Sequence, residues 1–305
     1  MPGCTPRAAA AATRWWPATR IELAQRYLSF FGSNFEQPPP VALPLEPAVS
    51  DPIGELIPAD ENKPFDMRQL IERLVNAGSL LEIHARWARE VVVAYGWLNG
   101  QAVGIVANQP KVKGGVLFVD SSDKCARFIA TCNAFNVPLL FLADVPGFMI
   151  GTQVEREGII RHGAKMISAV SEATVPKISV IVRKAYGARP TARGSTRWRG
   201  RPSIPTPAWR CPAPRSRSWG RRRRSTPCTS TSSRRLRIRR SAPLRPSGCA
   251  RAYAADIDVL HLASELVVNA VIEPERLRPE LIRRFALAAG KERQWPAKRG
   301  SVTPV

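Results

Sequence analysis

The chain has 305 residues, of which 46 are Lys or Arg and 24 are Asp or Glu, giving a formal net charge of +22. A charge of this size, if spread over the surface, predicts an anionic partner such as nucleic acid, but most of it lies in one segment and says little about partners. The six Cys form no C-x-x-C pair and no apolar run has the length of a membrane-spanning helix, so we expect neither a metal site nor a membrane partner.

The first half of the chain reads as globular after an Arg- and Ala-rich stretch at residues 1–20, to which we assign no function. Apolar periodicity predicts two helices and then four short strands, at 21–31, 66–76, 79–84, 90–97, 101–107 and 115–119. Asp66 is placed to cap the second helix. Asn99 and Gly100 separate two β-rich runs, which is a strong hairpin signal.

The next stretch predicts a β/α unit. A helix is expected over 121–136 and a longer one over 154–173. Between and after them, 137–143 and 176–183 are nearly continuous apolar runs of strand length, as expected for a sheet buried on both faces. The alternation indicates an α/β fold with parallel strands.

The segment 189–251 breaks this pattern. It contains 19 Arg and no Lys, Asp or Glu, and without those Arg the formal charge would be +3. It has no helical or strand periodicity and few large aliphatic residues, so it should not bury enough apolar surface to offset its ordering entropy. We therefore expect 189–253 to be a disordered interruption of the fold.

Two origins of this segment stay open. One is a basic arm that binds RNA. The other, which we favour, is a frameshift, because GC-rich DNA read out of frame yields Arg without Lys. Shifted codons permit AYGAGFHAMAGPAFDP for residues 190–205 and IAVMGPEAAVNAVYFNK for residues 216–232, and both read as globular text. Ordinary sequence resumes near Ala254, where helices are expected over 256–270 and 275–293. The predicted parts are therefore 1–20, 21–188, 189–253 and 254–305.

Candidate chemistry lies in the loops after the two buried strands, 144–152 and 184–188, because the carboxyl ends of parallel strands share one edge. These loops carry no nucleophile–base pair. Gly147, Gly151 and Gly187 permit close backbone approach, and consecutive amides at a helix start can bind an oxyanion. A plain tight turn is the alternative interpretation.

Other side chains have structural interpretations. We favour an Asx-type turn for Asp144 over a catalytic carboxylate, and a packing or hydrogen-bonding role for His162 over a base. Cys125 and Cys132 are expected to be buried thiols in a reducing compartment.

Several short stretches then occur in a recognisable order: Asn34–Pro40, Ile57–Pro58, Lys63–Met67, Gly104–Pro110, Asp144–Phe148, Gly158–Lys165, Ala173–Lys177 and Arg183–Gly187. Together they resemble the carboxyltransferase (beta) subunit of biotin-dependent acyl-CoA carboxylases of the propionyl-CoA/acetyl-CoA type. The resemblance covers about 21–188 and 254–293, and it corresponds mainly to the second of the family's two crotonase-like domains.

The resemblance implies a crotonase-like (ClpP/crotonase) α/β fold of ββα units. It also implies transfer of CO2 from carboxybiotin to the α-carbon of a short-chain acyl-CoA, with biotin carried by a biotinylated alpha subunit or carrier protein and no metal bound directly. A cytoplasmic homo-oligomer, a hexamer in the family, is the expected assembly.

The resemblance also assigns site residues. Gly187 and Ala188 match the backbone oxyanion hole for the biotin carbonyl, and the substrate-binding residues are expected to be Gly147, Phe148, Gly151 and Thr152. Because one family domain has no counterpart here and the Arg-rich text follows Ala188 directly, we expect the chain as written to be inactive. The alternatives are a nucleic-acid-binding protein that uses the 189–251 arm, and a structural or regulatory partner of an intact carboxylase.

Overall fold

A seven-stranded mixed sheet organises the part of the chain that the computed structural model describes, residues 17–58, 60, 63–185, 208–210 and 269–289. The strands lie in chain order across the sheet: β1 (Leu81–Ile83), β2 (Val91–Leu98), β3 (Gln101–Asn108), β4 (Leu139–Val145), β5 (Lys177–Ala185), β6 (Ala208–Arg210) and β7 (Ala270–Val271). The first three strands are antiparallel, and every pair from β3 onward is parallel.

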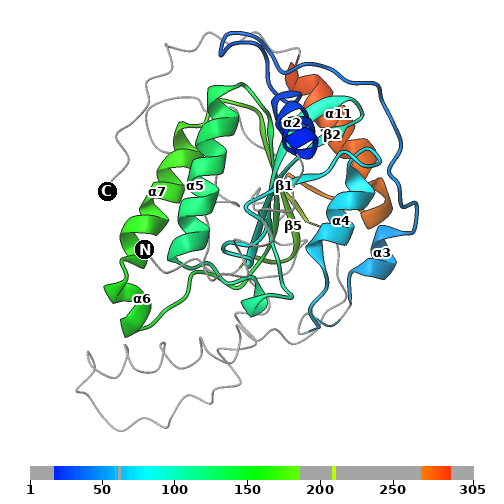
Figure 1. Ribbon diagram of the computed structural model, residues 1–305. Helices are drawn as coiled ribbons and strands as arrows, with labels where there is room; N and C mark the ends of the chain where they lie inside the picture. The colour runs from blue at the N-terminus through cyan, green and yellow to red at the C-terminus, as the bar shows by residue number, and fades with distance from the viewer. Residues whose placement is uncertain (1–16, 59, 61–62, 186–207, 211–268, 290–305) are drawn as a thin grey trace, which may run out of the picture.

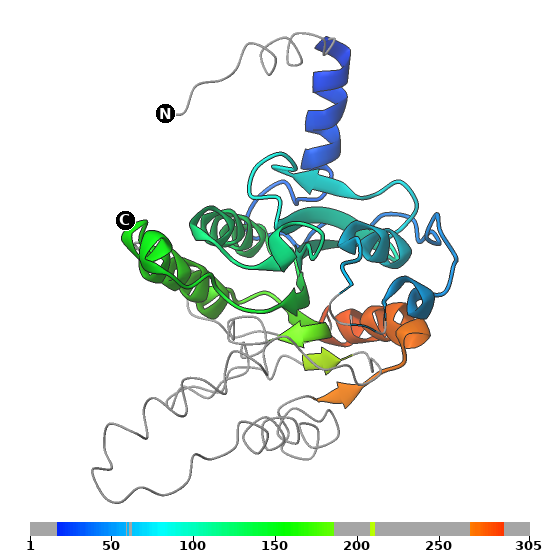
Figure 2. The same cartoon turned by 90° about the horizontal axis from the view of Figure 1, so that it is seen from below.

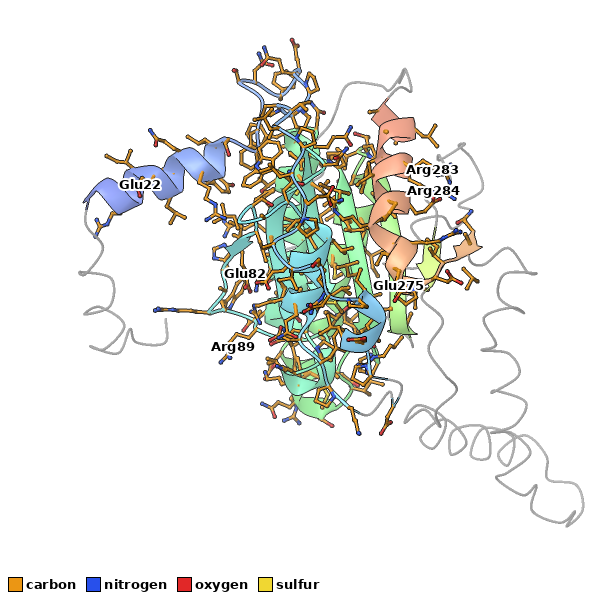
Figure 3. All side chains as sticks on the ribbon, turned by 90° about the vertical axis from the view of Figure 1, so that its right-hand side faces the viewer. Glu22, Glu82, Arg89, Glu275, Arg283 and Arg284 are labelled. Carbon is orange, nitrogen blue, oxygen red and sulfur yellow. The ribbon has the colours of Figure 1, made fainter. Side chains whose placement is uncertain are left out.

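Helices cover both faces of this sheet (Figure 1). On one face lie α5 (Val119–Ala134) and α7 (Ile159–Glu172), and on the other lie α4 (Met67–Leu74) and α11 (Leu277–Ala289). The short helices α3 (Ile53–Leu56) and η2 (Pro274–Arg276) lie side by side, where Glu275 accepts a hydrogen bond from the Gly54 amide (Figure 3). Helix α2 (Pro17–Leu28) extends away from the body (Figure 2). Within these described residues, no helix is long and apolar enough to cross a membrane.

Alternation of side chains along the strands divides the core into two layers. Val92 and Ala94 of β2 pack in the layer beneath α4 and α11, whereas Val91, Val93 and Tyr95 pack in the layer beneath α5 and α7. Every residue of β4 is buried, which explains why its sequence shows no apolar–polar alternation.

The β2–β3 hairpin forms as predicted. Asn99 has φ = 50° and Gly100 has φ = 83°, the left-handed pair that a type I′ turn requires. The Gly100 carbonyl accepts a hydrogen bond from the Ala42 amide at 2.8 Å. This contact joins the extended segment around Ala42, which we call the N-terminal strap, to the hairpin.

The predicted helix starts are confirmed at one position and shifted at another. Asp66 caps α4, with its Oδ1 accepting from the Arg68 amide at 3.0 Å. Helix α5 begins at Val119, two residues before the predicted Ser121, because the Ser121 hydroxyl accepts from the Phe118 amide at 2.6 Å and acts from within the first turn.

Two predictions fail because glycine reverses the backbone. The strand expected over 115–119 does not form: Lys113, Gly114 and Gly115 have positive φ and turn the chain, leaving one isolated bridge between Leu117 and Phe148. The single helix expected over 154–173 is two helices, α6 (Thr152–Arg156) and α7. Gly158, at φ = 88°, separates them, since a left-handed residue ends a helix.

Two further predictions differ from the structure at a few residues each. At the end of a helix expected over 256–270, Asn269 lies in a bend and Ala270 lies in β7, whereas 256–268 lie outside the described residues. Ala208–Arg210, inside the segment expected to be disordered, form β6 between β5 and β7. Three residues of extended backbone can satisfy their hydrogen bonds on the neighbouring strands whatever their side chains.

Replacement of Gly100 tests the strap contact, with Gly78 as a matched control. Both glycines have positive φ, but a Cβ added at Gly78 meets nothing within 4 Å, whereas one added at Gly100 overlaps the carbonyl oxygen of Ala42. Both Ala variants incur left-handed strain of about 1 kcal/mol. We expect Gly100→Ala to lower the free energy of unfolding by a further ~1–3 kcal/mol, measured by urea denaturation. Equal losses for the two variants would contradict the strap contact.

Candidate functional site at the carboxyl edge of the sheet

An ion pair buried between β4 and β5 marks the edge at which the candidate loops begin. Arg183 donates from Nη2 to Asp144 Oδ2 at 2.6 Å and from Nε to the same oxygen at 3.2 Å. Both side chains are 1% exposed. The two residues lie 39 positions apart, so the pairing of the strands brings them together.

An irregularity in β5 accompanies this pair. The register passes from Ala143 opposite Ile181 to Val145 opposite Ala185, so three residues of β5 face one residue of β4. Extra residues of this kind bend a strand and change the direction of a side chain, and they are common beside functional sites. Here the change occurs at Arg183, whose guanidinium meets Asp144.

Arg183 also fixes the connector before α4. Its Nη1 donates to the carbonyls of Lys63 at 2.9 Å and Asp60 at 3.4 Å, and its guanidinium carbon lies 4.6 Å from the centre of the Phe65 ring. One buried cation therefore joins β4, β5 and the connector, and satisfying so many donors reduces the cost of burying its charge. Asp144 is thus not an Asx-type turn as we favoured, because it lies inside β4 and its carboxylate binds Arg183.

The loop after β4 is held by backbone hydrogen bonds to Leu117. The Leu117 amide donates to the Gly147 carbonyl at 3.1 Å, and the Met149 amide donates to the Leu117 carbonyl at 2.8 Å. The Phe148 ring lies against α7, 3.3 Å from the point where a Cβ of Gly163 would be. These contacts fix the backbone at both ends of Phe148.

The predicted substrate-binding residues lie together on this loop. Gly147 is buried at φ = 136°, Phe148 is half-buried, and Gly151 at φ = 148° precedes Thr152, the exposed first residue of α6. Between them, Met149 and Ile150 are exposed, Ile150 by 82%. Gly187 and Ala188, predicted for the biotin carbonyl, lie outside the described residues.

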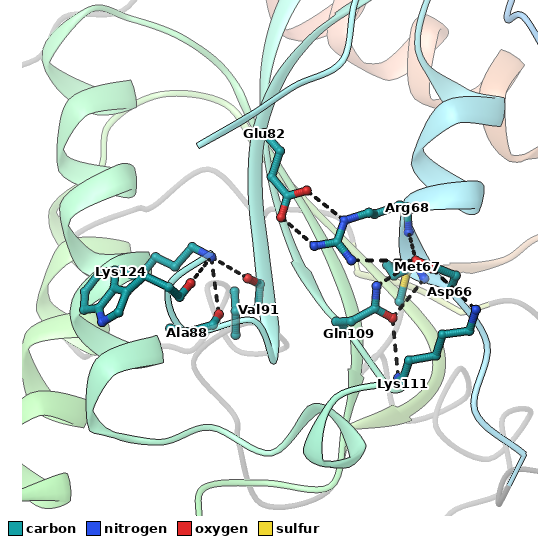
Figure 4. Close-up of polar contacts among 10 residues, drawn as sticks. Asp66, Met67, Arg68, Glu82, Ala88, Val91, Gln109, Lys111 and Lys124 are labelled. Atoms are coloured by element: carbon teal, nitrogen blue, oxygen red, sulfur yellow. Dashed lines mark hydrogen bonds and ion pairs between the residues drawn. The ribbon is translucent and has the colours of Figure 1, made fainter. Parts of the chain in front are cut away.

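A polar network at the end of β3 was not predicted (Figure 4). Gln109 donates to Asp66 Oδ1 at 2.7 Å and accepts from the Met67 amide at 3.3 Å, and Arg68 forms two 2.7 Å bonds to Glu82. Burial raises the pKa of the Asp66 carboxyl, but the hydrogen bonds from Gln109 and the Arg68 amide outweigh it, so the pKa is lowered. Two features of the sequence could have pointed to this network: the helix cap predicted at Asp66 and the Gly104–Pro110 stretch, which contains Gln109.

Lys124 is a second feature that sequence reasoning missed. It is 2% exposed, and its Nζ donates to the carbonyls of Trp87, Ala88 and Val91 (Figure 4). Burial lowers the pKa of this ammonium. The feature of the sequence that could have indicated a buried lysine is its position within the apolar pattern of 121–136. Its role in the structure is to hold the loop that precedes β2.

The expectations that His162 forms a hydrogen bond and that Cys125 and Cys132 are buried are confirmed. His162 forms a hydrogen bond, with its Nδ1 2.8 Å from Asp123 Oδ2. Cys125 and Cys132 are free, buried thiols, and burial raises the pKa of each to about 12. In the described ranges no three His, Cys, Asp or Glu side chains gather in a way that could hold a metal ion.

Comparison with known proteins now identifies the family. Residues 10–203 match the family model described as the carboxyl transferase domain, and the chain belongs to this family. It is similar to the uncharacterized carboxylase YngE of Bacillus subtilis (strain 168), with 45% identity over 286 residues, covering 93% of this chain and 55% of the relative.

The propionyl-CoA carboxylase beta chain of Saccharopolyspora erythraea is 45% identical over 185 residues, covering 57% of this chain and 34% of the relative. Among solved structures, transcarboxylase 12S matches with a TM-score of 0.78 and 32% identity, covering 93% of this chain and 53% of that one. The chain therefore spans about half the length, or less, of these relatives. The structural match confirms the predicted crotonase-like α/β fold, and nothing in the comparisons supports a nucleic-acid-binding protein.

A double-mutant cycle tests the central ion pair. We expect Asp144→Ala and Arg183→Ala each to lower the free energy of unfolding by ~3–5 kcal/mol, because each leaves a buried charge without its partner. The double variant should lose clearly less than the sum of the two. The measurement is urea denaturation.

The control for this cycle is Arg284→Ala (Arg284 is labelled in Figure 3). It removes an ion pair with Glu280 on α11 whose side chains are 28% and 23% exposed, and it should cost less than about 1 kcal/mol. The role given to the pair would be contradicted if Asp144→Ala and Arg183→Ala lowered the free energy of unfolding no more than Arg284→Ala does, and if the losses of the two single variants summed to that of the double variant.

Proposed function

We propose that this chain is the carboxyltransferase component of a biotin-dependent acyl-CoA carboxylase. The reaction of this component is the transfer of CO2 from carboxybiotin to the α-carbon of a short-chain acyl-CoA such as propionyl-CoA, and we expect the chain as written to be inactive in it. The observation that carries the proposal is the match to the carboxyl transferase domain over residues 10–203. The names of the relatives, which include propionyl-CoA carboxylase and methylmalonyl-CoA carboxyltransferase chains, favour a short acyl group.

The site proposed for this reaction is made of backbone rather than of catalytic side chains. Gly147, Phe148, Gly151 and Thr152 would contact the substrate, and the amides of Gly187 and Ala188 would bind the carbonyl of biotin. Preorganised amides stabilise an oxyanion without a reorganisation cost, so their placement matters more than their identity. The carboxylate of Asp144 is bound to Arg183, and its proposed role is to fix the edge and not to accept a proton.

The partners follow from the same proposal. Biotin would arrive on a biotinylated alpha subunit or carrier protein, and the chain would assemble as a homo-oligomer, for which the hexamer assembly of transcarboxylase 12S is the precedent. The buried, reduced thiols Cys125 and Cys132 fit a cytoplasmic location.

A chimera tests whether this chain supplies a competent carboxyltransferase part. Residues 21–185 would replace the matching stretch of the Saccharopolyspora erythraea propionyl-CoA carboxylase beta chain. We expect carboxylation of propionyl-CoA with a kcat within about tenfold of the parent, a difference of ~1.4 kcal/mol in activation free energy. Labelled product would be measured with carboxylated biotin carrier. A chimera that assembles and melts like the parent but forms no product would contradict the proposal.

The chain as written should behave differently. The segment 189–251 contains 19 Arg and no acidic residue, and it follows directly after Gly187 and Ala188. We therefore expect no carboxylated product when the purified chain is supplied with carboxybiotin and propionyl-CoA. The active parent of the chimera is the positive control. Clear, avidin-sensitive turnover by the unmodified chain would show that the Arg-rich segment is compatible with the reaction.

A further inference from the structure

The first turns of α5 and α7 are joined by a polar cluster that neither the fold nor the proposed reaction explains. His162 Nδ1 lies 2.8 Å from Asp123 Oδ2, and Lys165 Nζ lies 3.7 Å from Asp123 Oδ1. The side chains of His162 and Lys165 are 17% and 18% exposed. The Asp123 side chain is 34% exposed, so the contact is partly shielded and is screened less by solvent than a fully exposed pair.

The chemistry of this pair fixes one state of the imidazole. A carboxylate accepts only, so a neutral His162 must carry its proton on Nδ1 and leave Nε2 as an acceptor. Asp123 Oδ1 has no hydrogen bond within the described structure, but Lys165 Nζ faces it as an ion-pair partner at 3.7 Å. Among the described residues, the hydrogen bond to His162 is therefore the directional contact that orients this carboxylate.

His162 lies next to the Gly158 turn between α6 and α7, one residue before the contact with Phe148. Its amide donates to the carbonyl of Gly158 at 3.0 Å, and its ring lies 3.5 Å from the point where a Cβ of Gly158 would be. The next residue, Gly163, is the one against which the Phe148 ring packs at 3.3 Å. The turn that carries His162 therefore also supports Phe148.

These contacts form a continuous series that starts at Asp123 on α5 and returns to Leu117, just before α5. Asp123 holds His162, Gly163 receives Phe148, and the residues on either side of Phe148 are bonded to Leu117. Leu117 lies two residues before the start of α5. The series contains one link between side chains that depends on a proton, and that link is Asp123 to His162.

We propose that Asp123 and His162 are a positioning pair, which sets the orientation of the first turn of α7 and, through Gly163 and Phe148, the backbone of residues 147–152. The pair is not assigned a catalytic role, because neither side chain is placed in contact with substrate. The importance of this loop for activity rests on the proposed function, but the positioning itself does not.

Hydrogen exchange of the full chain tests the proposal without substrate. His162→Phe keeps an aromatic ring and removes the donor, and it should accelerate exchange of the Met149 amide and its neighbours in 147–152 by about tenfold or more through local opening. His162→Asn keeps a donor near the Nδ1 position and should stay within about threefold of the wild type. Exchange in the 91–108 hairpin is the internal reference.

Acceleration that is equal in the loop and the hairpin would mean that the pair only stabilises the whole fold, and it would overturn the proposal. Unchanged loop exchange in His162→Phe would overturn it as well. These outcomes say nothing about carboxylation, so a failure here is distinguishable from a failure of the proposed function.

A spectroscopic measurement separates positioning from packing and does not depend on the Phe variant folding. The ¹⁵N shifts of the His162 ring should show the Nδ1–H tautomer in the wild type and a shift toward Nε2–H in Asp123→Leu, which removes the acceptor. Gly163→Ala, which displaces Phe148 but leaves Asp123 in place, should release the loop without changing the tautomer. A tautomer that does not respond to Asp123→Leu would overturn the assignment.

Discussion

The buried contact between Asp144 and Arg183 is the constraint on which the functional edge depends. A guanidinium in the protein interior is tolerated only when its donors are satisfied. Arg183, on β5, donates to Asp144 in β4 and to the carbonyls of Asp60 and Lys63 in the connector before α4, where it also lies against the Phe65 ring. Because the cost of leaving it unpaired is high, β4, β5 and the connector share one arrangement. The loop after β4 therefore leaves the sheet from a fixed point.

From that point, glycines determine the shape of the loop. Gly163 leaves room for the Phe148 ring, and Gly158 turns the chain between α6 and α7. A Cβ added at Gly115 would lie 3.0 Å from the carbonyl oxygen of Asp144, so the absence of a side chain there allows the 113–115 turn to approach β4 closely. The result is a site defined by main-chain direction. Such a geometry suits the stabilisation of a transient negative charge by amides, which is the chemistry that we propose for this chain.

The sequence predicted the elements whose information is local. The β2–β3 hairpin followed from Asn99 and Gly100, and β4 followed from a run of apolar residues that only a doubly covered sheet can bury. It did not predict the partner of Asp144, because that partner lies 39 residues away and is reached only through strand pairing. It also misjudged Gly114 and Gly158, since glycine is compatible with both signs of φ and the choice is made by tertiary contacts. The sequence predicted a loop after β4, but it placed the loop's start at Asp144, which lies inside the strand, and it did not predict the ion pair that fixes this point.

Lys124 has a consequence for how the protein responds to its solvent. The ammonium is held by three backbone carbonyls, at a depth where only 2% of the residue is exposed. Mobile ions screen pairs of exposed charges but hardly reach a buried cation bound to peptide dipoles. The loop before β2 should thus keep its place in concentrated salt, while the more exposed ion pairs along α11 weaken. These two parts of the protein therefore differ in their sensitivity to ionic strength.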